Sequence, residues 1–513
     1  MRMARAWSVA LVGVEGTMVE VEAVISSGLP RTILVGLPDA ALNEARERCG
    51  AAMAAAGLGW PADRVTINLS PAALPKAGSH YDLAIVAAVA AAGGVCERRG
   101  LEELALFGEV GLDGRVRAVR GLLPAVLAAS RRFARVVVPV SQLREAELVE
   151  GISALGVESL ADLLDILRGG PGCPHPPAPA PAAEQPAARD LRDVAGQPEA
   201  KWALEVAAAG RHHLFLHGPP GVGKTLLAER LPGILPDLEV AESLEVSAIH
   251  SLAGTPLVDG LIRRPPYADP HHTASMASLV GGGARMAVPG AVSRAHRGVL
   301  FLDEVAEFNP RALDALRVPL ESGRIVLGRA LATTSYPASF QLVMAANPCP
   351  CGLHGTAGAQ CRCTPSEIRR YGQKVSGPIL DRVDIHQHLA PMRKAFLAAA
   401  LRTAESSQVV ADRVRAARER QRARLTGFGW RTNGEVPGPV LRRALPLPEG
   451  AELLDEAVGQ GRLSARGVDK VLRLAWTLAD LDGVGRPTRR HLTLALALRR
   501  GEQRGPGGGR GRA

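Results

Sequence analysis

The stretch Leu214-Phe-Leu-His-Gly-Pro-Pro-Gly-Val-Gly-Lys-Thr225 decides the fold of the central part of this chain. Its apolar start, Leu214 to His217, predicts a short buried strand, and the residues that follow, Leu226 to Leu231, predict a helix. The glycines between strand and helix allow backbone N–H groups to surround phosphate oxygens at the positive end of the helix dipole. Strand, glycine-rich loop and helix in this order therefore predict a site for the phosphates of a nucleotide.

Each residue of this loop has a predicted part in binding ATP. Lys224 is expected to reach the β- and γ-phosphates, and the hydroxyl of Thr225 is expected to bind Mg²⁺. The backbone of the loop completes the cradle around the phosphates. The predicted ATP-binding residues of the loop are Gly218, Pro219, Pro220, Gly221, Val222, Gly223, Lys224 and Thr225.

Two further apolar segments are predicted to deliver polar side chains to this site. Val299 to Leu302 predicts a buried strand that ends in Asp303 and Glu304. Asp303 is expected to hold Mg²⁺ through water, and Glu304 is expected to orient and polarise the water that attacks ATP. A predicted strand from Gln341 to Ala346 ends at Asn347, whose amide is expected to contact the γ-phosphate or its water.

Two arginines are predicted to complete the hydrolytic chemistry. Arg382, within Gly377 to Asp384, is expected to lie beyond the sheet, where a ring-forming ATPase presents a cation to the γ-phosphate bound by its neighbour. Arg466, at the start of a predicted helix from Ser464 to Leu481, is the candidate for a second cation that senses bound ATP. The predicted catalytic residues are therefore Lys224, Glu304 and Arg382, and the additional ATP-binding residues are Asn347 and Arg466.

The order of strand and helix patterns along the chain predicts an α/β protein with several domains. A chain of 513 residues exceeds what one hydrophobic core usually supports. Strands and helices alternate in residues 1–168, a Pro/Ala-rich linker occupies 169–188, and patterns typical of a core with a parallel sheet occupy 189–395. Residues 396–500 predict a helical lid, and the Gly/Arg-rich residues 501–513 predict a disordered tail.

Composition narrows the class of protein. The formal net charge of +10 favours a polyanionic partner without identifying it. No apolar stretch reaches the roughly 18 to 20 residues that cross a bilayer, and the N-terminus lacks the pattern of a cleaved signal peptide, so a cytoplasmic location is expected. Seven cysteines in a large chain of this kind argue against a framework of disulfides.

Four of the cysteines lie close together in the sequence. Cys349 and Cys351 form one C-x-C pair, and Cys361 and Cys363 form another. Four thiolates can hold one tetrahedral Zn²⁺, but the spacing inside each pair is tighter than usual, and His354 could replace one thiol as a ligand. The sequence leaves two interpretations open, a structural zinc site and free or redox-active thiols.

Short motifs throughout the chain resemble those of one family, the competence protein ComM/YifB-like, magnesium-chelatase-type AAA+ ATPases. Besides the phosphate loop they include INLSPA (67–72), KAGSHYDLAI (76–85), PHHTAS (270–275), HRGVLFLDE (296–304), NPCPCG (347–352) and GPILDRVD (377–384). The resemblance covers nearly the whole chain. It implies a homo-hexameric ring that hydrolyses ATP to drive branch migration and unwinding of DNA, in recombination or natural transformation.

The same resemblance implies contacts with DNA. Magnesium-chelatase-type cores carry insertions that project loops towards the pore of the ring, and residues 249–297 and 323–340 occupy the corresponding places. Single-stranded or branched DNA would be held through its phosphates, independently of base sequence. The candidate contacts are Arg263, Arg264, His271, His272, Arg324 and Arg329.

The N-terminal residues resemble the proteolytic domain of Lon proteases, through PKAGSHYDLAI (75–85) and FGEVGLDGRVRAVRGLLPAVLAA (107–129). His80 stands where Lon-type sequences carry the serine nucleophile, and Leu123 stands where they carry the partnering lysine. A serine nucleophile needs a base within hydrogen-bond reach. The expected domain is therefore Lon-like (S5-type) in fold and lacks the catalytic dyad.

A second class of function stays open. The same ATPase core would serve an enzyme that remodels a protein partner, resembling a subunit of magnesium chelatase, with the N-terminal domain as its binding module. Chelatase subunits normally act with separate large partners and lack a Lon-like domain. The two interpretations differ in whether DNA stimulates ATP hydrolysis.

Overall fold

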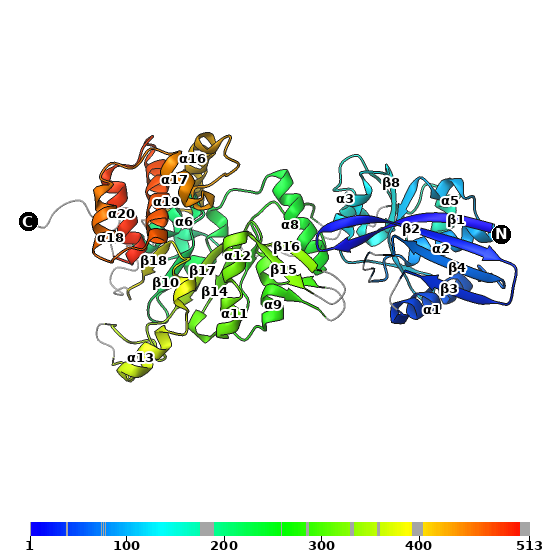
Figure 1. The fold of residues 1–513 in the computed structure, drawn as a ribbon, viewed down its shortest axis with the longest axis horizontal. Coiled ribbons are helices and arrows are strands. Elements are labelled where there is room, and N and C mark those ends of the chain that lie inside the picture. The colour runs from blue at the N-terminus through cyan, green and yellow to red at the C-terminus, as the bar shows by residue number, and fades with distance from the viewer. Residues whose placement is uncertain are drawn as a thin grey trace, which may run out of the picture.

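The computed structural model describes residues 2–36, 39–72, 74, 76, 78–174, 189–257, 259–283, 287–328, 333–356, 360–391 and 404–502. They form an N-terminal α/β body, a central α/β body and a C-terminal helical body, which follow one another along the long axis of the molecule (Figure 1). This architecture confirms the predicted fold class. The boundaries between the predicted domains stay predictions, because most of the predicted linker and tail lies outside the described residues.

The N-terminal body is built on a seven-stranded mixed sheet in the order β3-β4-β2-β1-β5-β8-β9. Along β2, buried Val19, Val21 and Ala23 alternate with partly buried Glu20 and Glu22, as expected for a strand with one face on the core. The strands of the sheet are β1 (Arg2–Val12), β2 (Glu15–Ser26), β3 (Arg31–Val35), β4 (Arg64–Ser70), β5 (Leu104–Leu106), β8 (Arg135–Pro139) and β9 (Ser153–Val157).

Helices cover this sheet. The most deeply buried is α2 (Asp82–Gly93), which is apolar on nearly every side and packs against β1, β2 and α1. A helix without a polar face is typical of a position inside a core. The others are α1 (Asp39–Ala55), α3 (Leu122–Ala129), α4 (Leu143–Ala146) and α5 (Leu160–Leu167), and a small β6–β7 hairpin (Glu109–Val110 and Val116–Arg117) lies beside α2.

The central body contains a five-stranded parallel sheet in the order β11-β14-β17-β10-β18. The strand that leads into the phosphate loop, β10, lies inside the sheet between β17 and β18. Parallel strands end at the same edge, which is where ligands bind in open α/β sheets. The strands are β10 (Leu214–His217), β11 (Tyr267–Ala268), β14 (Val299–Leu302), β17 (Gln341–Ala346) and β18 (Ile385–His388).

Helices and two short hairpins surround the central sheet. The helices are α6 (Pro198–Gly210), α7 (Lys224–Ala228), α8 (Val240–Ala253), α9 (Met276–Val280), α10 (Ala291–Arg294), α11 (Pro310–Asp314), α12 (Arg317–Ser322), α13 (Pro365–Gly372) and α14 (Gly377–Leu380). The hairpins are β12–β13 (Gly281–Gly282 and Val288–Pro289) and β15–β16 (Arg324–Gly328 and Thr333–Pro337). The helix after the phosphate loop is shorter than predicted, because it ends before Pro232 starts a 3-10 turn.

The C-terminal body consists of α16 (Ser407–Leu425), α17 (Gly438–Arg443), α18 (Glu452–Gly459), α19 (Ala465–Asp482) and α20 (Arg489–Arg500). Ser464 caps the start of α19, and Gly483 ends it in the left-handed conformation. α16 and α19 both pack on α6, so Trp476 and Val414 share one hydrophobic core with Leu204 of the central body. None of the helices in the described ranges combines the length and hydrophobicity of a membrane span.

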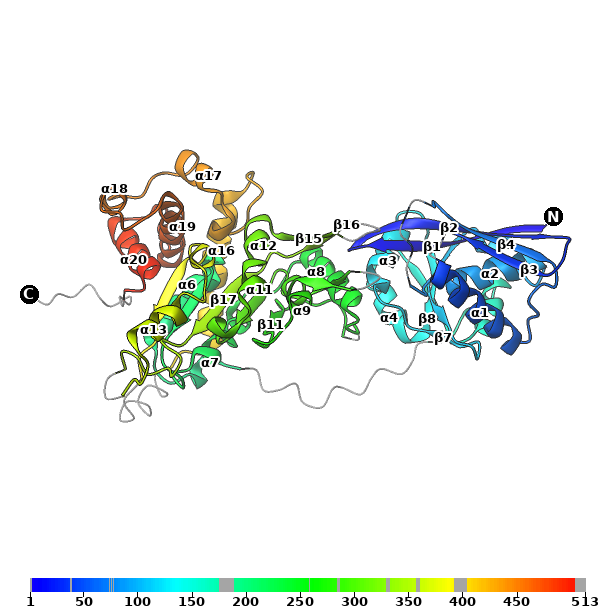
Figure 2. The same cartoon turned by 60° about the horizontal axis from the view of Figure 1, so that its bottom comes forward.

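The N-terminal body contacts the central body through α8 and the β15–β16 hairpin, which lie beside β1, β2 and α3 in both ribbon views (Figures 1 and 2). Leu252 of α8 and Tyr336 of β16 join an apolar cluster with Leu11 and Leu122. Gly121, at the start of α3, donates its N–H to the carbonyl of Ser251 at 3.1 Å. Parts of residues 249–297 and 323–340, the two segments predicted to face a pore, thus pack on the N-terminal body. Their orientation towards a pore stays a prediction.

Candidate active site

The phosphate loop connects β10 to α7 in a conformation that requires its glycines. Gly221 and Gly223 have φ angles of +78° and +94°, in the left-handed region that side chains disfavour. A Cβ at Gly218 would lie 2.5 Å from the carbonyl oxygen of Leu389, which follows β18. The backbone from Gly218 to Gly223 therefore curves at the carboxyl edge of the sheet, directly before the N-terminus of α7.

Lys224 folds back over this loop. Its ammonium donates to the carbonyl oxygens of Gly218 at 2.6 Å and Pro219 at 3.0 Å, and to Oδ1 of Asn347 at 2.9 Å. These three contacts use all three N–H donors of the ammonium. The side chain is buried, and burial lowers the pKa of Lys224 despite the nearby carboxylates of Asp303 and Glu304. The structure thus brings together the two residues predicted to meet the γ-phosphate.

Thr225, the second residue of α7, lies beside Asp303, which directly follows β14. The Thr225 hydroxyl donates to Oδ2 of Asp303 at 2.7 Å. The other oxygen, Oδ1, accepts the backbone N–H of Glu304 at 2.9 Å, which fixes the orientation of the carboxylate. A hydroxyl and a carboxylate are hard oxygen donors of the kind that Mg²⁺ prefers. These two residues therefore fit the predicted magnesium site.

Glu304 stands in a strained backbone position. Its φ and ψ are 49° and 44°, which is the left-handed region for a residue that has a side chain, and such strain is concentrated at functional sites. Its carboxylate is half-exposed, and Nδ1 of His272 lies 3.6 Å from Oε2. His272 follows the edge strand β11, and its ring is tilted by 34° against that of His271, with the ring centroids 4.1 Å apart. Sequence reasoning grouped His272 with the DNA contacts and missed its place beside Glu304.

Arg382 and Arg466 lie together, away from the phosphate loop. Both approach Oε1 of Glu321, Arg382 at 2.5 Å and Arg466 at 3.6 Å. Arg466 also lies 3.8 Å from Asp381, and its side chain is 65% exposed. Within the described part of the chain, no hydrogen bond or ion pair joins either arginine to residues 218–225. The structure thus groups Arg466 with Arg382 and not with Lys224.

The sulfur atoms of the four clustered cysteines lie close together, and the first of these residues, Cys349, comes two positions after Asn347 in the sequence. The Sγ atom of Cys349 lies 3.3 Å from that of Cys351 and 3.7 Å from that of Cys361, and the last two are 3.6 Å apart. All four sulfur atoms, including that of Cys363, lie within 4.8 Å of one another. His354 approaches through its backbone, whose N–H points at the sulfur of Cys349.

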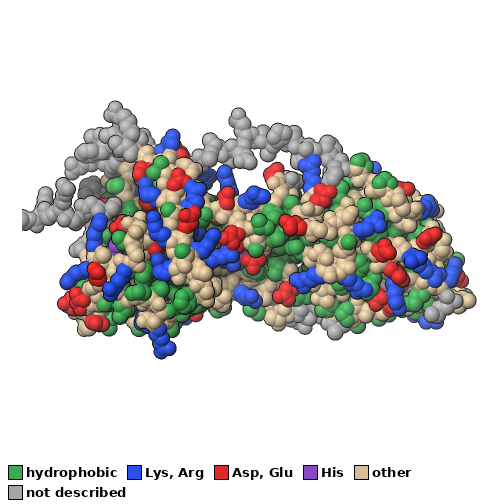
Figure 3. Space-filling view, turned by 90° about the horizontal axis from the view of Figure 1, so that it is seen from above, with side chains coloured by type: hydrophobic (Ala, Val, Ile, Leu, Met, Phe, Trp, Pro, Cys, Tyr) green, Lys and Arg blue, Asp and Glu red, His purple; other side chains and the backbone are tan. Residues whose placement is uncertain are grey.

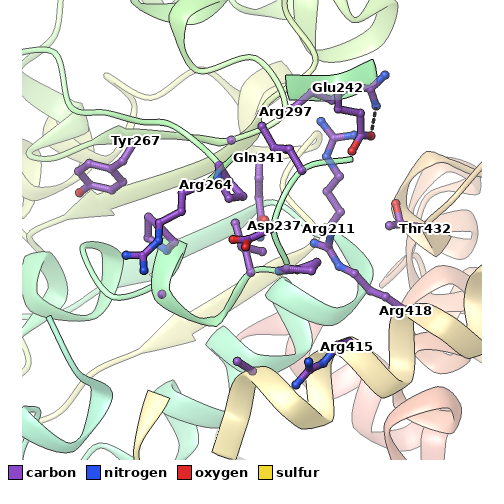
Figure 4. A pocket seen from close by; sticks show the side chains of 18 of the residues that line it. Arg211, Asp237, Glu242, Arg264, Tyr267, Arg297, Gln341, Arg415, Arg418 and Thr432 are labelled. Atoms are coloured by element: carbon purple, nitrogen blue, oxygen red, sulfur yellow. Dashed lines mark ion pairs between the residues drawn. The ribbon is translucent and has the colours of Figure 1, made fainter. Parts of the chain in front are cut away.

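At the opposite end of the strands, a cavity of about 1040 Å³ separates the central body from α16 (Figure 4). Gly298 and Gln341, at the starts of β14 and β17, line its floor. Its arginines face a similar number of carboxylates: Arg297 pairs with Glu242 at 3.5 Å, for example. Because the positive charge of these arginines is balanced by carboxylates, the cavity does not have the excess positive charge that would bind a polyanion.

The predicted DNA contacts are dispersed. Arg264 lines the cavity of Figure 4, and Arg263 lies beside it in sequence; both are exposed. His271 is exposed beside the active site, and Arg324 is exposed at the start of β15. Arg329 lies outside the described residues. On the face shown in Figure 3, basic and acidic side chains are interspersed, so that face carries no single basic patch.

Comparison with known proteins identifies the family. Three family profiles cover most of the chain: "Magnesium chelatase, subunit ChlI" matches residues 190–396, "Subunit ChlI of Mg-chelatase" matches 21–142, and "Magnesium chelatase, subunit ChlI C-terminal" matches 404–499. A partial match to Lon protease 2 of Bacillus subtilis, 31% identical, covers 29% of this chain and 28% of that protein, in keeping with the predicted Lon-like similarity.

Full-length relatives agree with these profiles. An uncharacterized protein of Mycobacterium tuberculosis is 53% identical, over 97% of this chain and 99% of its own length. The uncharacterized protein YifB of Escherichia coli is 41% identical over 96% of both chains. Competence protein ComM of Haemophilus influenzae is 37% identical over 97% of this chain and 98% of its own. The chain therefore belongs to the ComM/YifB-like family of magnesium-chelatase-type AAA+ ATPases.

Proposed function

We propose that this protein is a DNA motor, a homo-hexameric ring that hydrolyses ATP to drive branch migration or unwinding of single-stranded or branched DNA. The observation that carries the proposal is the division of the catalytic groups. Lys224, Thr225, Asp303 and Glu304 meet at one edge of the sheet, while Arg382 and Arg466 lie together elsewhere. Within one chain, the predicted nucleotide site and the two arginines are thus apart, and a second subunit would be needed to bring them together.

The groups at the sheet edge match the needs of ATP hydrolysis. The N–H donors of Lys224, now bonded to loop carbonyls and Asn347, would turn to the β- and γ-phosphates of ATP. Mg²⁺, held by Thr225 and Asp303, would neutralise charge on the phosphates. Glu304 would orient the attacking water and accept its proton, and its contact with His272 would restrain it until substrate binds.

The arginine pair supports a ring. A guanidinium stabilises phosphoryl transfer only when it reaches the γ-phosphate, and a neighbouring subunit can supply it. Arg382 is held by Glu321 and by the carbonyl of Pro378, and Arg466 projects into solvent beside it. In a closed head-to-tail ring, each subunit would present both arginines to the site of the next.

Two features favour DNA as the substrate of the proposed motor. The net charge of +10 favours a polyanion, and the exposed residues Arg263, Arg264, His271 and Arg324 would contact phosphates without reading bases. The name of the Haemophilus influenzae relative, a competence protein, suggests a process that handles DNA. His271 and His272 adjoin each other, so DNA held at His271 would act on the His272 contact with Glu304.

The alternative is an ATPase that remodels a protein partner. A magnesium-chelatase 38 kDa subunit of Rhodobacter capsulatus is 30% identical to this chain, but the match covers 30% of this chain and 49% of that subunit. The partial coverage favours the DNA motor, because the ComM and YifB relatives match over nearly the whole length.

Rates of ATP hydrolysis with and without DNA separate the two functions. Single-stranded DNA or a four-way junction should stimulate the wild-type protein, and only the wild type should migrate the junction. Glu304→Gln is the matched control, because it keeps the size of the side chain and removes the base. A hydrolysis rate that no form of DNA changes would reject the motor and favour a protein partner.

A further inference from the structure

The four-cysteine cluster adjoins residues of the predicted nucleotide site. Asn347, whose amide contacts Lys224, directly follows β17, and Cys349 comes two residues later with its side chain fully buried. Gly352 lies against the phosphate loop: a Cβ added there would be 2.6 Å from Cδ of Pro220 and 3.9 Å from the amide carbon of Asn347. The cysteine turn is therefore packed on the loop that would hold the phosphates.

The sulfur positions fit a tetrahedral metal. In a zinc tetrathiolate with Zn–S bonds of about 2.3 Å, neighbouring sulfur atoms are separated by about 3.8 Å. The separations among Cys349, Cys351 and Cys361 are 3.3, 3.7 and 3.6 Å, and Cys363 completes a group in which no pair exceeds 4.8 Å. The tight C-x-C spacing therefore does not prevent both thiols of a pair from reaching one centre.

Backbone N–H groups point at two of the sulfur atoms of this cluster. The N–H of His354 points at the sulfur of Cys349 at 3.3 Å, and the N–H of Leu353 points at the sulfur of Cys351. Such hydrogen bonds orient metal ligands and contribute to the affinity for the metal. Among the described residues, the possible ligands that lie within 4.8 Å of one another are the four cysteines and do not include His354.

We infer that Cys349, Cys351, Cys361 and Cys363 bind one Zn²⁺, and that this zinc centre braces Asn347 and Pro220 against the phosphates of ATP. The metal would cross-link Cys349 and Cys351, which follow Asn347, to Cys361 and Cys363. Without it, the segment that carries Asn347 and Gly352 loses the cross-link that presses it on the phosphate loop. The inference rests on the proposed ATP site but not on DNA as the substrate.

Metal analysis tests the binding. The purified full-length protein should contain about one zinc per chain. The double variant Cys361→Ser/Cys363→Ser should lose it, whereas Cys173→Ser, which alters an isolated cysteine elsewhere in the fold, should keep it. Iron in place of zinc, no metal after incubation with Zn²⁺, or unchanged zinc in the double variant would each overturn the assignment.

A pair of glycine variants tests the brace while all four thiols stay in place. Gly352 and Gly355 have similar φ angles, +78° and +74°, so alanine strains both positions alike, but a Cβ at Gly355 meets nothing within 4 Å. Gly352→Ala should keep its zinc and lose about tenfold or more in affinity for a fluorescent ATP analogue. Gly355→Ala should keep both the zinc and the affinity. Equal affinities in the two variants would overturn the brace.

Reversible removal of the metal guards against misfolding of the variants. A mercurial reagent with a chelator should release the zinc from the wild-type protein and weaken nucleotide binding, and added Zn²⁺ with thiol reductant should restore it. Nucleotide affinity that survives release of the metal would overturn the brace. The readouts are metal content and nucleotide binding without DNA, so a failure of DNA stimulation leaves them intact and refutes only the proposed motor.

Discussion

Replacing Lys470 with methionine should loosen the C-terminal helices from the ATPase core. Lys470 lies on α19, and its ammonium donates to Oδ1 of Asp384, directly before β18, at 2.7 Å. It also donates to the carbonyl oxygen of Arg382 at 2.7 Å. The two side chains are only 11% and 6% exposed, so this ion pair links the two bodies inside a protein environment.

The structure gives the size of the effect. Burial alone would raise the pKa of Asp384, but Lys470 and the neighbouring His212 and His213 outweigh it and hold the pKa well below its usual value. Replacing Lys470 removes the largest of these opposing effects and leaves the buried Asp384 carboxylate without its ion-pair partner. An orphaned buried charge costs about 3–5 kcal/mol. With a urea dependence of about 2 kcal/mol per M, the unfolding midpoint should fall by about 1.5–2.5 M.

Urea unfolding followed by far-UV circular dichroism measures this shift. Lys374→Met is the matched control, because Lys374 forms an ion pair with Glu307 at 3.0 Å with both side chains more than 40% exposed. Losing an exposed pair should cost below about 1 kcal/mol. Adding Asp384→Asn to Lys470→Met removes the orphaned charge and should recover much of the loss. Equal midpoints for the two methionine variants would refute the reasoning.

Three further outcomes follow from the site. His272→Ala should raise the rate of ATP hydrolysis without DNA by up to about fivefold, because the variant frees Glu304 from a contact worth about 1 kcal/mol or less. An unchanged rate in a coupled ATPase assay would contradict this. Arg382→Ala should lower kcat about 10³-fold or more and keep the affinity for an ATP analogue. Mixing it with Lys224→Ala protein should restore hydrolysis at hybrid interfaces, and a mixture that stays inactive would argue against a shared site. Burial lowers the pKa of His80 to about 4 in the folded protein, whereas the pKa of an unfolded histidine is about 6.5. Between these two values only the unfolded chain takes up the proton, so thermal stability should fall as the pH drops from about 6.5 towards 4. His80→Gln should make the fall shallower, and an equal slope in the variant would exclude His80 as its source.

The sequence predicts best those parts of the site that are local or that follow from a parallel sheet. The phosphate loop is contiguous, so its strand, glycines and helix can be recognised together. The contacts of Asn347 with Lys224 and of Asp303 with Thr225 arise because β14, β17 and β10 are neighbours that end at one edge. Polar residues that directly follow such strands can therefore be expected to meet, even when they are far apart along the chain.

Other contacts depend on packing that leaves no local pattern. His272 reaches Glu304 because β11, a strand of two residues, pairs with β14 at the edge of the sheet. Arg466 begins a helix that can be predicted, but its closeness to Glu321 is set by how α19 packs on the core. For the cysteines, spacing in the sequence argued weakly for a metal, whereas the fold of the turn decides which sulfur atoms meet.

The contact between α8 and the N-terminal body has a mechanical consequence. α8 begins at Val240, beside the cavity of Figure 4, and its 14 residues span about 21 Å before they reach the N-terminal body. Near its middle, Glu245 holds His296 at 3.0 Å, in the segment that leads into β14 and Glu304. At its far end, Ser251 donates its hydroxyl to the buried carboxylate of Glu145 at 2.6 Å. A tilt of about 10° at the base of such a rod would move its tip by about 4 Å. The helix is thus placed to act as a lever arm: a small rearrangement near the start of β14 would be transmitted along α8 as a larger displacement of the N-terminal body.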